Sequence, residues 1–380
     1  MIRYARITGW GKYVPARVLT NHDLAQMVDT SDEWITSHTG IKERRIRGEH
    51  ETTSSMAVAA SLPALDKAGL TPQDLDLIIV ATNSPDYMLP GVANIVQHRL
   101  GATCGAFTLV NGCSGWVYAL VTASQFIQTG MYSNILVVGV EIISHAVDWQ
   151  DRTTCVLFGD AAAAIVLQPS EEPSGVLSFE LGSDGSGAEY LYVPAAGTVK
   201  PLADNVESIV KNRECYIKMN GQGVLRFAVR VFARSLKRVI YQAGLTPDDI
   251  DLYIPHQANA RLIELGARML RQPLDKFYIN IHKYGNTSTA SVPLALVEAI
   301  EEGRLKPGDK IALIAFGAGL TWASAVVQMG VGEISPAHSL FSLGRARYLA
   351  RRAQNAILDT AQSIVLPLYT FVRIRARNGK

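Results

Sequence analysis

Apolar residues follow two different spacings along the chain, and the two spacings alternate from about residue 4 to residue 328. Short runs rich in β-branched residues, such as 77–80 and 135–138, predict buried strands. Longer stretches with a helical spacing of apolar residues predict helices at 52–68, 113–129, 223–243 and 291–302. Strands that alternate with helices of this length predict an α/β fold, with mainly parallel or mixed sheets packed in layers with helices.

One stretch of the sequence occurs twice. AGLTPQDLDLIIV at 68–80 returns as AGLTPDDIDLYIP at 243–255, an offset of 175 residues. A second pair, ILVVG at 135–139 and IALIA at 311–315, has an offset of 176 residues. Two separate matches at nearly one spacing indicate a duplication. We therefore predict a first half at 1–172, a second half at 173–330 and an extension at 331–380.

Composition narrows the function classes. The chain has 380 residues, 48% of them hydrophobic and 18% charged, which is typical of a globular protein with a sizeable core. A net charge of +2 gives no sign of nucleic-acid binding. The four cysteines show neither Cys-x-x-Cys nor metal-ligand spacing, which predicts no metal site and a reducing, cytoplasmic location. They are Cys104, Cys113, Cys155 and Cys215. The N-terminus lacks the apolar core of a signal peptide, and no apolar run reaches the roughly 20 residues that span a bilayer.

Cys113 lies between two glycines, after a predicted strand and before a long apolar stretch, in the segment Asn111-Gly112-Cys113-Ser114-Gly115. Unpaired N–H groups and the positive end of the helix dipole meet at a helix N-terminus, and both favour a thiolate. The glycines would let a thioester come close. A buried cysteine that only fills space is the plainer alternative for this residue alone. The rest of the chain favours a nucleophile.

Two polar turns in the second half supply partners for Cys113. His256 directly follows a strand, at the end where open α/β sheets bind ligands, although a surface or core histidine is the plainer alternative. Asn286 follows a glycine, and a helix N-cap is its plainer alternative. Adding 175 to Cys113 gives Ser288, so a pseudo-twofold axis would bring this turn and the cysteine to one site. The glycine-rich segment 316–322 could add backbone donors to an oxyanion hole.

Together these residues resemble the β-ketoacyl-acyl-carrier-protein synthase III family of thiolase-fold condensing enzymes. The resemblance runs from about Tyr4 to Gln328. Its motifs are Thr30-Ser31-Asp32-Glu33-Trp34-Ile35, Thr39-Gly40-Ile41, Cys113-Ser114-Gly115, Phe158-Gly159-Asp160, Pro255-His256-Gln257-Ala258-Asn259, Gly285-Asn286-Thr287-Ser288 and Phe316-Gly317. It implies a thiolase-like fold, a homodimer, and decarboxylative condensation of an acyl-CoA primer with malonyl-acyl-carrier protein through an acyl-cysteine. No metal and no cofactor are implied.

The resemblance also implies a role for each matching residue. The catalytic triad would be Cys113, His256 and Asn286, and the oxyanion hole would be the backbone N–H groups of Cys113 and Ala318. Coenzyme A would contact Thr30, Trp34, His38, Arg152 and Asn259. The carrier protein would contact Gln257, Ala258, Asn259, Ala260 and Arg261. The acyl chain would be surrounded by Val156, Phe158, Leu225 and, from the partner subunit, Leu89.

Three positions depart from the family pattern. His38 stands where an arginine is usual, Ala318 interrupts the usual Gly-Gly-Gly, and Leu89 replaces a common phenylalanine. Smaller or more flexible pocket walls could admit a branched or longer primer. The length and branching of the primer stay open.

The extension 331–380 lies outside the resemblance. It has eight Lys or Arg residues and two acidic residues, hence a net charge of +6, and its apolar residues follow helical spacing between 349 and 364. A helix docked on the core explains this pattern. Attraction to an acidic carrier protein or to an anionic membrane surface explains it equally well.

Other activities are compatible with the same motifs. A family member could move an acyl group to an alcohol or another acceptor, or could serve polyketide synthesis with a different primer. A catalytically silent partner subunit is a further class. An intact set of Cys113, His256 and Asn286 favours condensation, because simple transfer needs no pair of enolate-stabilising donors.

Overall fold

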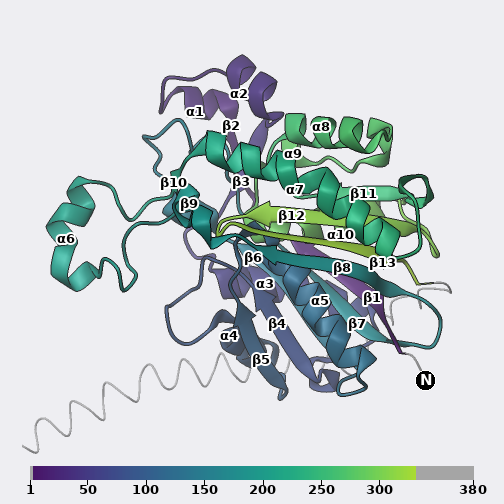
Figure 1. Ribbon diagram of the computed structural model, residues 1–380. Coiled ribbons are helices and arrows are strands. Elements are labelled where there is room, and N and C mark those ends of the chain that lie inside the picture. Colours follow the sequence, from purple (N-terminus) through teal and green to yellow (C-terminus); the bar gives the residue numbers. More distant parts are fainter. Residues whose placement is uncertain (1–2, 331–380) are drawn as a thin grey trace, which may run out of the picture.

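Two β-sheets alternate with three layers of helices in the computed structural model, which describes residues 3–330 (Figure 1). The first sheet has the strand order β1-β7-β6-β4-β5 and the second has the order β11-β12-β13-β8. The strands of the first sheet are β1 (Tyr4–Tyr13), β4 (Leu77–Ala81), β5 (Gly105–Leu109), β6 (Ile135–Glu141) and β7 (Ala161–Ser170). Those of the second sheet are β8 (Gly175–Ser183), β11 (Leu252–Pro255), β12 (Lys310–Gly317) and β13 (Thr321–Gln328).

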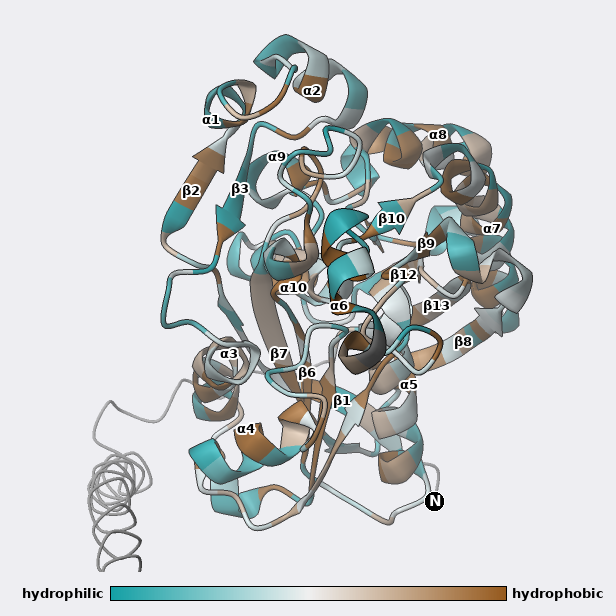
Figure 2. Ribbon diagram, turned by 90° about the vertical axis from the view of Figure 1, so that its left-hand side faces the viewer, coloured by the Kyte–Doolittle hydropathy of each residue, from teal (hydrophilic) through white to brown (hydrophobic). Residues whose placement is uncertain are grey.

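Each helix layer buries its apolar side chains against a sheet. The outer face of the first sheet packs against α3 (Thr53–Lys67) and α4 (Val92–Leu100). The outer face of the second sheet packs against α7 (Gly221–Gln242) and α8 (Ala260–Leu270). Between the sheets lie α5 (Gly115–Gln128) and α10 (Ser291–Glu301), in one core cluster that contains residues from both halves. Figure 2 shows both hydropathy colours on α4, as expected of an amphipathic helix.

Smaller elements surround these layers. A cap above the second sheet contains α1 (Asn21–Ala25), α2 (Asp32–Thr39), and the antiparallel pair β2 (Arg17–Thr20) and β3 (Glu43–Ile46). An arm that projects from the body carries α6 (Leu202–Lys211), near the short pair β9 (Leu191–Tyr192) and β10 (Lys218–Met219). The short helix α9 (Ile281–Tyr284) precedes the Asn286 turn. None of the helices between residues 3 and 330 combines the length and hydropathy that crossing a membrane requires.

The predicted layers and the four predicted helices are confirmed, the helix ends within two residues. The sheets are mixed: β4 runs parallel to β5 and β6, and β11 parallel to β12, whereas β1, β7, β8 and β13 join antiparallel. Parallel pairing needs a crossover, usually a helix. The connections from β6 to β7 and from β12 to β13 carry no α-helix, so the chain returns antiparallel.

The duplication is visible in both sheets. In order, β1, β7, β6 and β4 correspond to β8, β13, β12 and β11, with the same parallel or antiparallel pairing at each step. The repeated sequence also makes the same local structure twice. Thr71 and Thr246 each begin a 3-10 turn whose third residue, Asp74 or Asp249, accepts the threonine N–H at 2.7 and 2.8 Å. The two halves therefore fold alike, while the boundaries at 172/173 and 330/331 stay predictions.

Candidate active site

Three predicted catalytic side chains lie at the ends of strands and helices where the two halves meet. Cys113 is in a 3-10 turn (Gly112–Ser114) between β5 and α5. His256 follows β11, and Asn286 lies between α9 and the 3-10 turn Ser288–Ala290. All three are buried, with exposed fractions of 7%, 2% and 7%. Each residue lies where the chain leaves the carboxyl end of a strand or helix.

Side-chain and backbone contacts bring these three residues to one place. Cys113 Sγ lies 3.5 Å from Ser288 Oγ, and the Ser288 N–H donates to Asn286 Oδ1 at 2.8 Å. The Asn286 amide oxygen is thereby occupied, so its NH2 group is oriented as the donor. On the other side, a Cβ at Gly317 would lie 2.8 Å from the Cys113 Cβ, so only glycine permits this approach.

His256 is linked to this cluster by Phe316, the residue before Gly317. The Phe316 ring meets the imidazole edge-on, with 5.4 Å between the ring centroids. The Nδ1 atom of His256 lies 2.5 Å from Ser291 Oγ, at the start of α10. Burial lowers the pKa of His256 to about 3. The imidazole is therefore neutral at physiological pH.

The pseudo-twofold prediction is confirmed by the contact between Cys113 and Ser288, but the pairing of these residues is wrong by one position. Gly112 and Ser288 open the two equivalent 3-10 turns with φ of 56° and 50°. The helices that follow, α5 and α10, begin 176 residues apart. Hence Thr289 is the counterpart of Cys113, and Ser288 that of Gly112.

The predicted low pKa of the Cys113 thiol is wrong in this structure. Burial raises the pKa to about 11, and the Glu141 carboxylate also raises it. Hydrogen bonds from Ser288 and from the backbone N–H groups of Cys113 and Ala318 lower the pKa only in part. The resting thiol is therefore protonated near neutral pH, and those donors favour a thiolate as it forms.

This raised pKa gives a testable pH dependence. Because only the thiolate reacts, alkylation of Cys113 by iodoacetamide should accelerate roughly tenfold per pH unit from pH 7 to about 10. Peptide mass spectrometry would measure the rate at each cysteine separately, with the exposed Cys215 as the control. A rate that levels off below pH 8 would contradict the buried, protonated thiol.

The backbone at Ala318 lies against the nucleophile's turn. A Cβ at Gly112 would be 2.6 Å from the Ala318 oxygen and 3.0 Å from its nitrogen. Ala318 belongs to the three-residue connection between β12 and β13, the glycine-rich turn that the sequence predicts. This proximity fits the predicted oxyanion hole of Cys113 and Ala318 N–H groups, which stays a prediction.

The residues predicted to contact coenzyme A gather at α2. The Trp34 ring stacks on the His38 ring with 4.5 Å between the ring centroids. The Arg152 guanidinium lies over the Trp34 ring, 4.9 Å from its centroid. Asn259, the N-cap of α8, donates to the His38 carbonyl at 2.9 Å and so links α8 to α2. The buried Thr30 hydroxyl has no hydrogen-bond partner within residues 3–330. This cluster offers an aromatic face, a cation and an unused hydroxyl to a ligand.

The segment 257–261 is only partly accessible. Ala258, Asn259 and Ala260 are half-buried and Arg261 is exposed. Gln257 is 1% exposed; its amide donates to the Pro255 and Tyr278 carbonyls and accepts the N–H groups of residues 280 and 281. The prediction that Gln257 contacts a carrier protein is therefore wrong, because its polar atoms hold two loops together inside the protein.

The predicted acyl-pocket residues fall into two groups. Val156 and Phe158 are buried in one core cluster, and Phe158 forms a β-bridge with Asn286. Leu89 is 86% exposed and Leu225 is 51% exposed. The buried positions of Val156 and Phe158 fit an inner wall of the predicted pocket, and the exposure of Leu89 fits a contribution to a partner subunit; both roles stay predictions.

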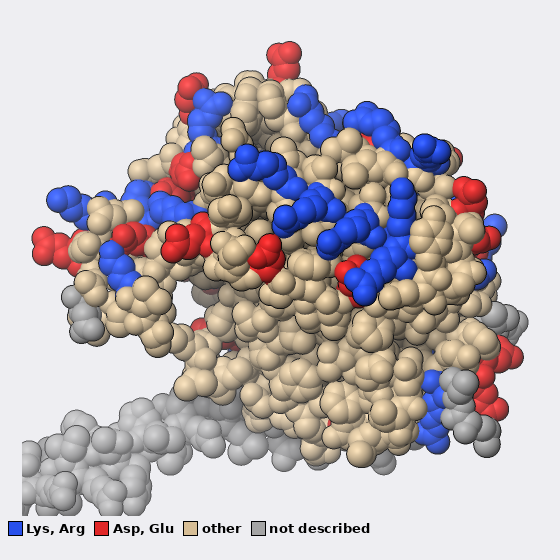
Figure 3. Space-filling view, viewed as in Figure 1, with Lys and Arg blue, Asp and Glu red and all other residues tan. Residues whose placement is uncertain are grey.

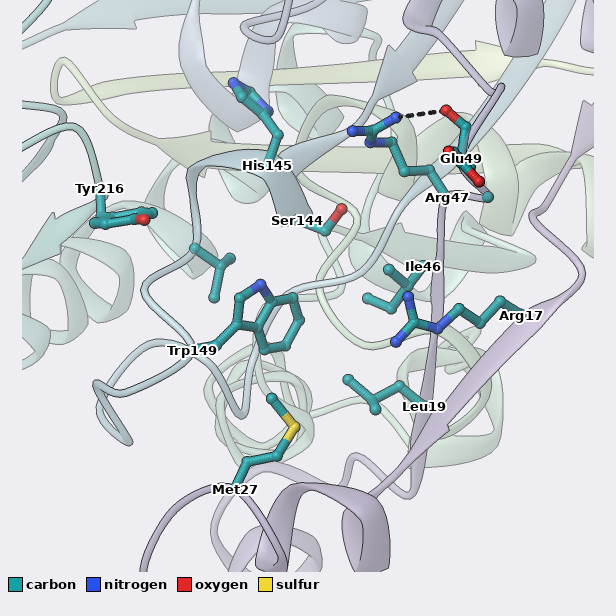
Figure 4. A pocket seen from close by; sticks show the side chains of 12 residues that line it. Arg17, Leu19, Met27, Ile46, Arg47, Glu49, Ser144, His145, Trp149 and Tyr216 are labelled. Atoms are coloured by element: carbon teal, nitrogen blue, oxygen red, sulfur yellow. Dashed lines mark hydrogen bonds between the residues drawn. The ribbon is translucent and has the colours of Figure 1, made fainter.

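A separate pocket of about 520 Å³ opens beside the cap (Figure 4). Trp149 lies at its centre in this view, with the Arg17 and Arg47 side chains to one side and His145 above. None of the predicted site residues lines it. Its lining is Arg17, Leu19, Met27, Ile46, Arg47, Gly48, Glu49, Ser144, His145, Val147, Trp149 and Tyr216.

Sequence reasoning missed several polar residues that support the site. Ser291 contacts His256, and Asn83 and Glu141 form a buried network beside Gly112. Arg44, which is fully buried, donates to the Val156 carbonyl at 2.7 Å and so supports the predicted acyl wall. A charged residue that ends an otherwise apolar strand, as Glu141 does, is the signal that could have identified one of them.

Comparisons with known proteins give the same family over most of the chain. Models described as 3-oxoacyl-[acyl-carrier-protein (ACP)] synthase III and as its C-terminal part match residues 107–185 and 240–329. A β-ketoacyl-[acyl-carrier-protein] synthase III of Caldanaerobacter subterraneus subsp. tengcongensis is 52% identical over 325 residues, covering 85% of this chain and 97% of that protein.

Solved structures agree with this result. The 3-oxoacyl-[acyl-carrier-protein] synthase III from Aquifex aeolicus VF5 is 46% identical with a TM-score of 0.79, covering 85% of this chain and 99% of that one. The priming β-ketosynthase of the R1128 polyketide biosynthetic pathway is 33% identical with a TM-score of 0.80, covering 87% of this chain and 97% of that one. The resemblance seen in the sequence is thus confirmed: the chain belongs to the β-ketoacyl-acyl-carrier-protein synthase III family.

Proposed function

We propose that this protein condenses an acyl-CoA primer with malonyl-acyl-carrier protein, with loss of carbon dioxide, and so starts fatty-acid synthesis. The observation that carries the proposal is the convergence of Cys113, His256 and Asn286 in one buried place, within a chain of this family. A nucleophilic sulfur and two neutral donors are what this two-step chemistry needs.

In the first step, Cys113 sulfur attacks the acyl-CoA carbonyl carbon. The Cys113 and Ala318 N–H groups hold the developing oxyanion. The carbon–sulfur bond to coenzyme A breaks, and the thiol proton leaves with coenzyme A as its free thiol. The cluster of Thr30, Trp34 and Arg152 would bind the coenzyme; the Arg152 guanidinium, which lies 4.9 Å from the centre of the Trp34 ring, would move aside to let the adenine stack between the two.

In the second step, the malonyl thioester carbonyl accepts hydrogen bonds from His256 and Asn286. We assign Ser291 Oγ as the donor to His256 Nδ1, an arrangement in which Nε2–H is free to donate to the carbonyl. As the carbon–carbon bond to carbon dioxide breaks, both donors stabilise the enolate, which attacks the acyl-cysteine carbonyl. The carbon–sulfur bond to Cys113 then breaks, the β-ketoacyl-carrier protein leaves, and the Cys113 thiolate takes a proton from water. Sulfur and hydrogen-bond donors carry every step, so we propose no metal and no cofactor.

Release of free thiol from acyl-CoA tests this function directly. With acyl-CoA alone, one equivalent of coenzyme A per site should appear in a burst. Turnover should then require malonyl-acyl-carrier protein. Sustained release with an alcohol acceptor, or no release at all, would favour the acyl-transfer and silent-subunit alternatives respectively. A series of straight and branched primers would settle the question that Leu89 and Ala318 raise about primer size.

A basic surface on α7, whose buried Phe232 packs against Phe316 beside His256, supports an acidic carrier protein as partner. Four exposed arginines follow one another at four-residue spacing along α7, and Figure 3 shows Lys and Arg side chains gathered across this face. They are Arg226, Arg230, Arg234 and Arg238. Among the described side chains, Arg230 pairs with Asp184 and Arg238 with Glu180, whereas no ion pair forms at Arg226 or Arg234. Arg261 adds an exposed charge at the start of α8, which packs on α7.

Reversing two of these charges should selectively weaken binding of the carrier protein. In the double variant Arg226→Glu/Arg234→Glu, the KM for malonyl-acyl-carrier protein should rise at least about tenfold, and added salt should shrink the difference, because exposed charges are screened. Acylation by acyl-CoA should be unchanged. Arg99→Glu, on α4, is the matched control. Equal effects of both variants would refute a docking role for α7.

Further proposals concern assembly and location. Strand β5 lies at the edge of its sheet, and Val110 beside it is 68% exposed. The loop residues Tyr87, Met88 and Leu89 are 63%, 84% and 86% exposed. This apolar edge supports a homodimer in which the partner subunit's Leu89 reaches the acyl pocket.

All four cysteines are unpaired, which supports a cytoplasmic location. The basic extension 331–380, with its possible carrier-protein or membrane contact, lies outside the described residues.

A further inference from the structure

Glu141 ends strand β6 as a carboxylate with 0% exposure. Four hydrogen bonds reach it from the loop after β4. The donors are Thr82 Oγ1 at 3.1 Å, the Asn83 N–H at 2.9 Å, Asn83 Nδ2 at 2.8 Å and Ser84 Oγ at 2.6 Å. A buried charge is costly unless it is hydrogen-bonded, so this carboxylate fixes the loop that surrounds it.

Asn83 connects Glu141 to the turn that carries the nucleophile. Its Oδ1 atom accepts the Gly112 N–H at 3.0 Å, and Nδ2 also donates to Thr289 Oγ1 at 2.9 Å. Thr289 Oγ1 in turn donates to the Gly112 carbonyl at 2.8 Å. Both polar backbone atoms of Gly112 are therefore held, one by a residue of each half of the chain.

Gly112 packs closely against the connection between β12 and β13. Its φ is 56°, and even a methyl group there would meet the Ala318 oxygen at 2.6 Å. A shift of Gly112 would displace both the N–H and the sulfur of Cys113 relative to Ala318. A displacement of about 1 Å in an active site can cost on the order of a hundredfold in rate.

We propose that Asn83, held by Glu141, is a positioning residue that fixes the Gly112–Cys113 turn for attack on the acyl-CoA thioester. The inference rests on the proposed function, which makes Cys113 the nucleophile. Asn83 contacts neither the sulfur nor the predicted coenzyme A cluster. Its loss should therefore lower the acylation rate constant and leave acyl-CoA affinity nearly unchanged.

The test reverses the direction of the hydrogen bond between Asn83 and Glu141. Asn83→Asp keeps an acceptor for the Gly112 N–H but turns a second oxygen toward Glu141. Adding Glu141→Gln restores a donor between the two side chains, with its direction reversed and the charge of the pair kept. The control is Asn134→Asp, because Asn134 also bridges two segments of the same half, through Gln168 and the Asp74 carbonyl.

Rapid-mix mass spectrometry of the acyl-cysteine would give the rate and the acyl-CoA dissociation constant for each full-length variant, beside its melting temperature. We expect Asn83→Asp to acylate about a hundredfold more slowly, with affinity within about twofold of wild type. The double variant should recover to within about tenfold of wild type, and Asn134→Asp should match wild type.

Two results would overturn the inference: a folded Asn83→Asp that acylates at the wild-type rate, or a folded double variant that acylates no faster than the single one. If Asn83→Asp does not fold, Glu141→Gln and the double variant carry the same comparison. A wild-type chain that forms no adduct at Cys113 would instead refute the proposed function itself.

Discussion

Replacing Cys113 with alanine should abolish the covalent acyl adduct and lower overall condensation by at least about 10⁴-fold, the largest effect of any single substitution here. No other described cysteine lies in a turn at a helix N-terminus with Ser288 and Ala318 donors around its sulfur. Intact-protein and peptide mass spectrometry after incubation with acetyl-CoA would measure the adduct. The substitution removes one buried atom, so the fold should persist.

Cys155→Ala is the matched control for this experiment. Cys155 is buried like Cys113, and burial raises the pKa of its thiol to about 11 as well. It has no place in the proposed chemistry, so its loss should leave acylation intact. An acyl group found on Cys104, Cys155 or Cys215 of the wild-type protein would remove Cys113 from the mechanism.

Replacing His256 or Asn286 with alanine should separate the two steps. Acylation of Cys113 should stay nearly intact, while condensation with malonyl-acyl-carrier protein should fall by roughly a hundredfold or more, as when one oxyanion donor is lost. Radiolabelled acyl-CoA would follow each step. His282→Ala is the control, since His282 is a histidine of α9 outside the proposed chemistry. Equal losses of acylation and condensation in both variants would rule out this division of labour.

The lowered pKa of His256 also predicts how the condensation step depends on pH. Because the pKa of His256 is lowered to about 3, the imidazole stays neutral as pH falls from 8 to 5. Protonation of this residue should therefore not reduce condensation in that range. In the unfolded chain the histidine binds a proton below about pH 6.5. Folding stability from the neutral buried form is thus full above that value and declines as pH falls toward 3.

Periodicity predicted the layers and the long helices, because buried faces impose regular spacing on the sequence, and the repeated segment at 68–80 and 243–255 predicted the duplication. Cys113 could be predicted from its glycine neighbours and the apolar stretch that follows. The pKa of its thiol could not, since the low-dielectric surroundings and the nearby Glu141 come from distant elements that meet only in the fold.

Gln257 illustrates the opposite error. Its place in a motif suggested a surface role, yet its amide ties the end of β11 to the chain before α9. The Asn83–Glu141 contact was equally hidden, because it depends on β4 and β6 being neighbours in the sheet although 58 residues separate the two side chains. Contacts of this kind follow from strand order, which local patterns do not contain.

One measurement tests the central claim, that acyl-Cys113 is the intermediate of a decarboxylative condensation. Enzyme acylated in advance and freed of excess acyl-CoA would be mixed with malonyl-acyl-carrier protein labelled in its free carboxyl group. We predict that one equivalent of labelled carbon dioxide, one β-ketoacyl-carrier protein and one regenerated Cys113 thiol appear per acyl-enzyme. Loss of the acyl group from Cys113 with the label retained on the carrier protein would contradict the account.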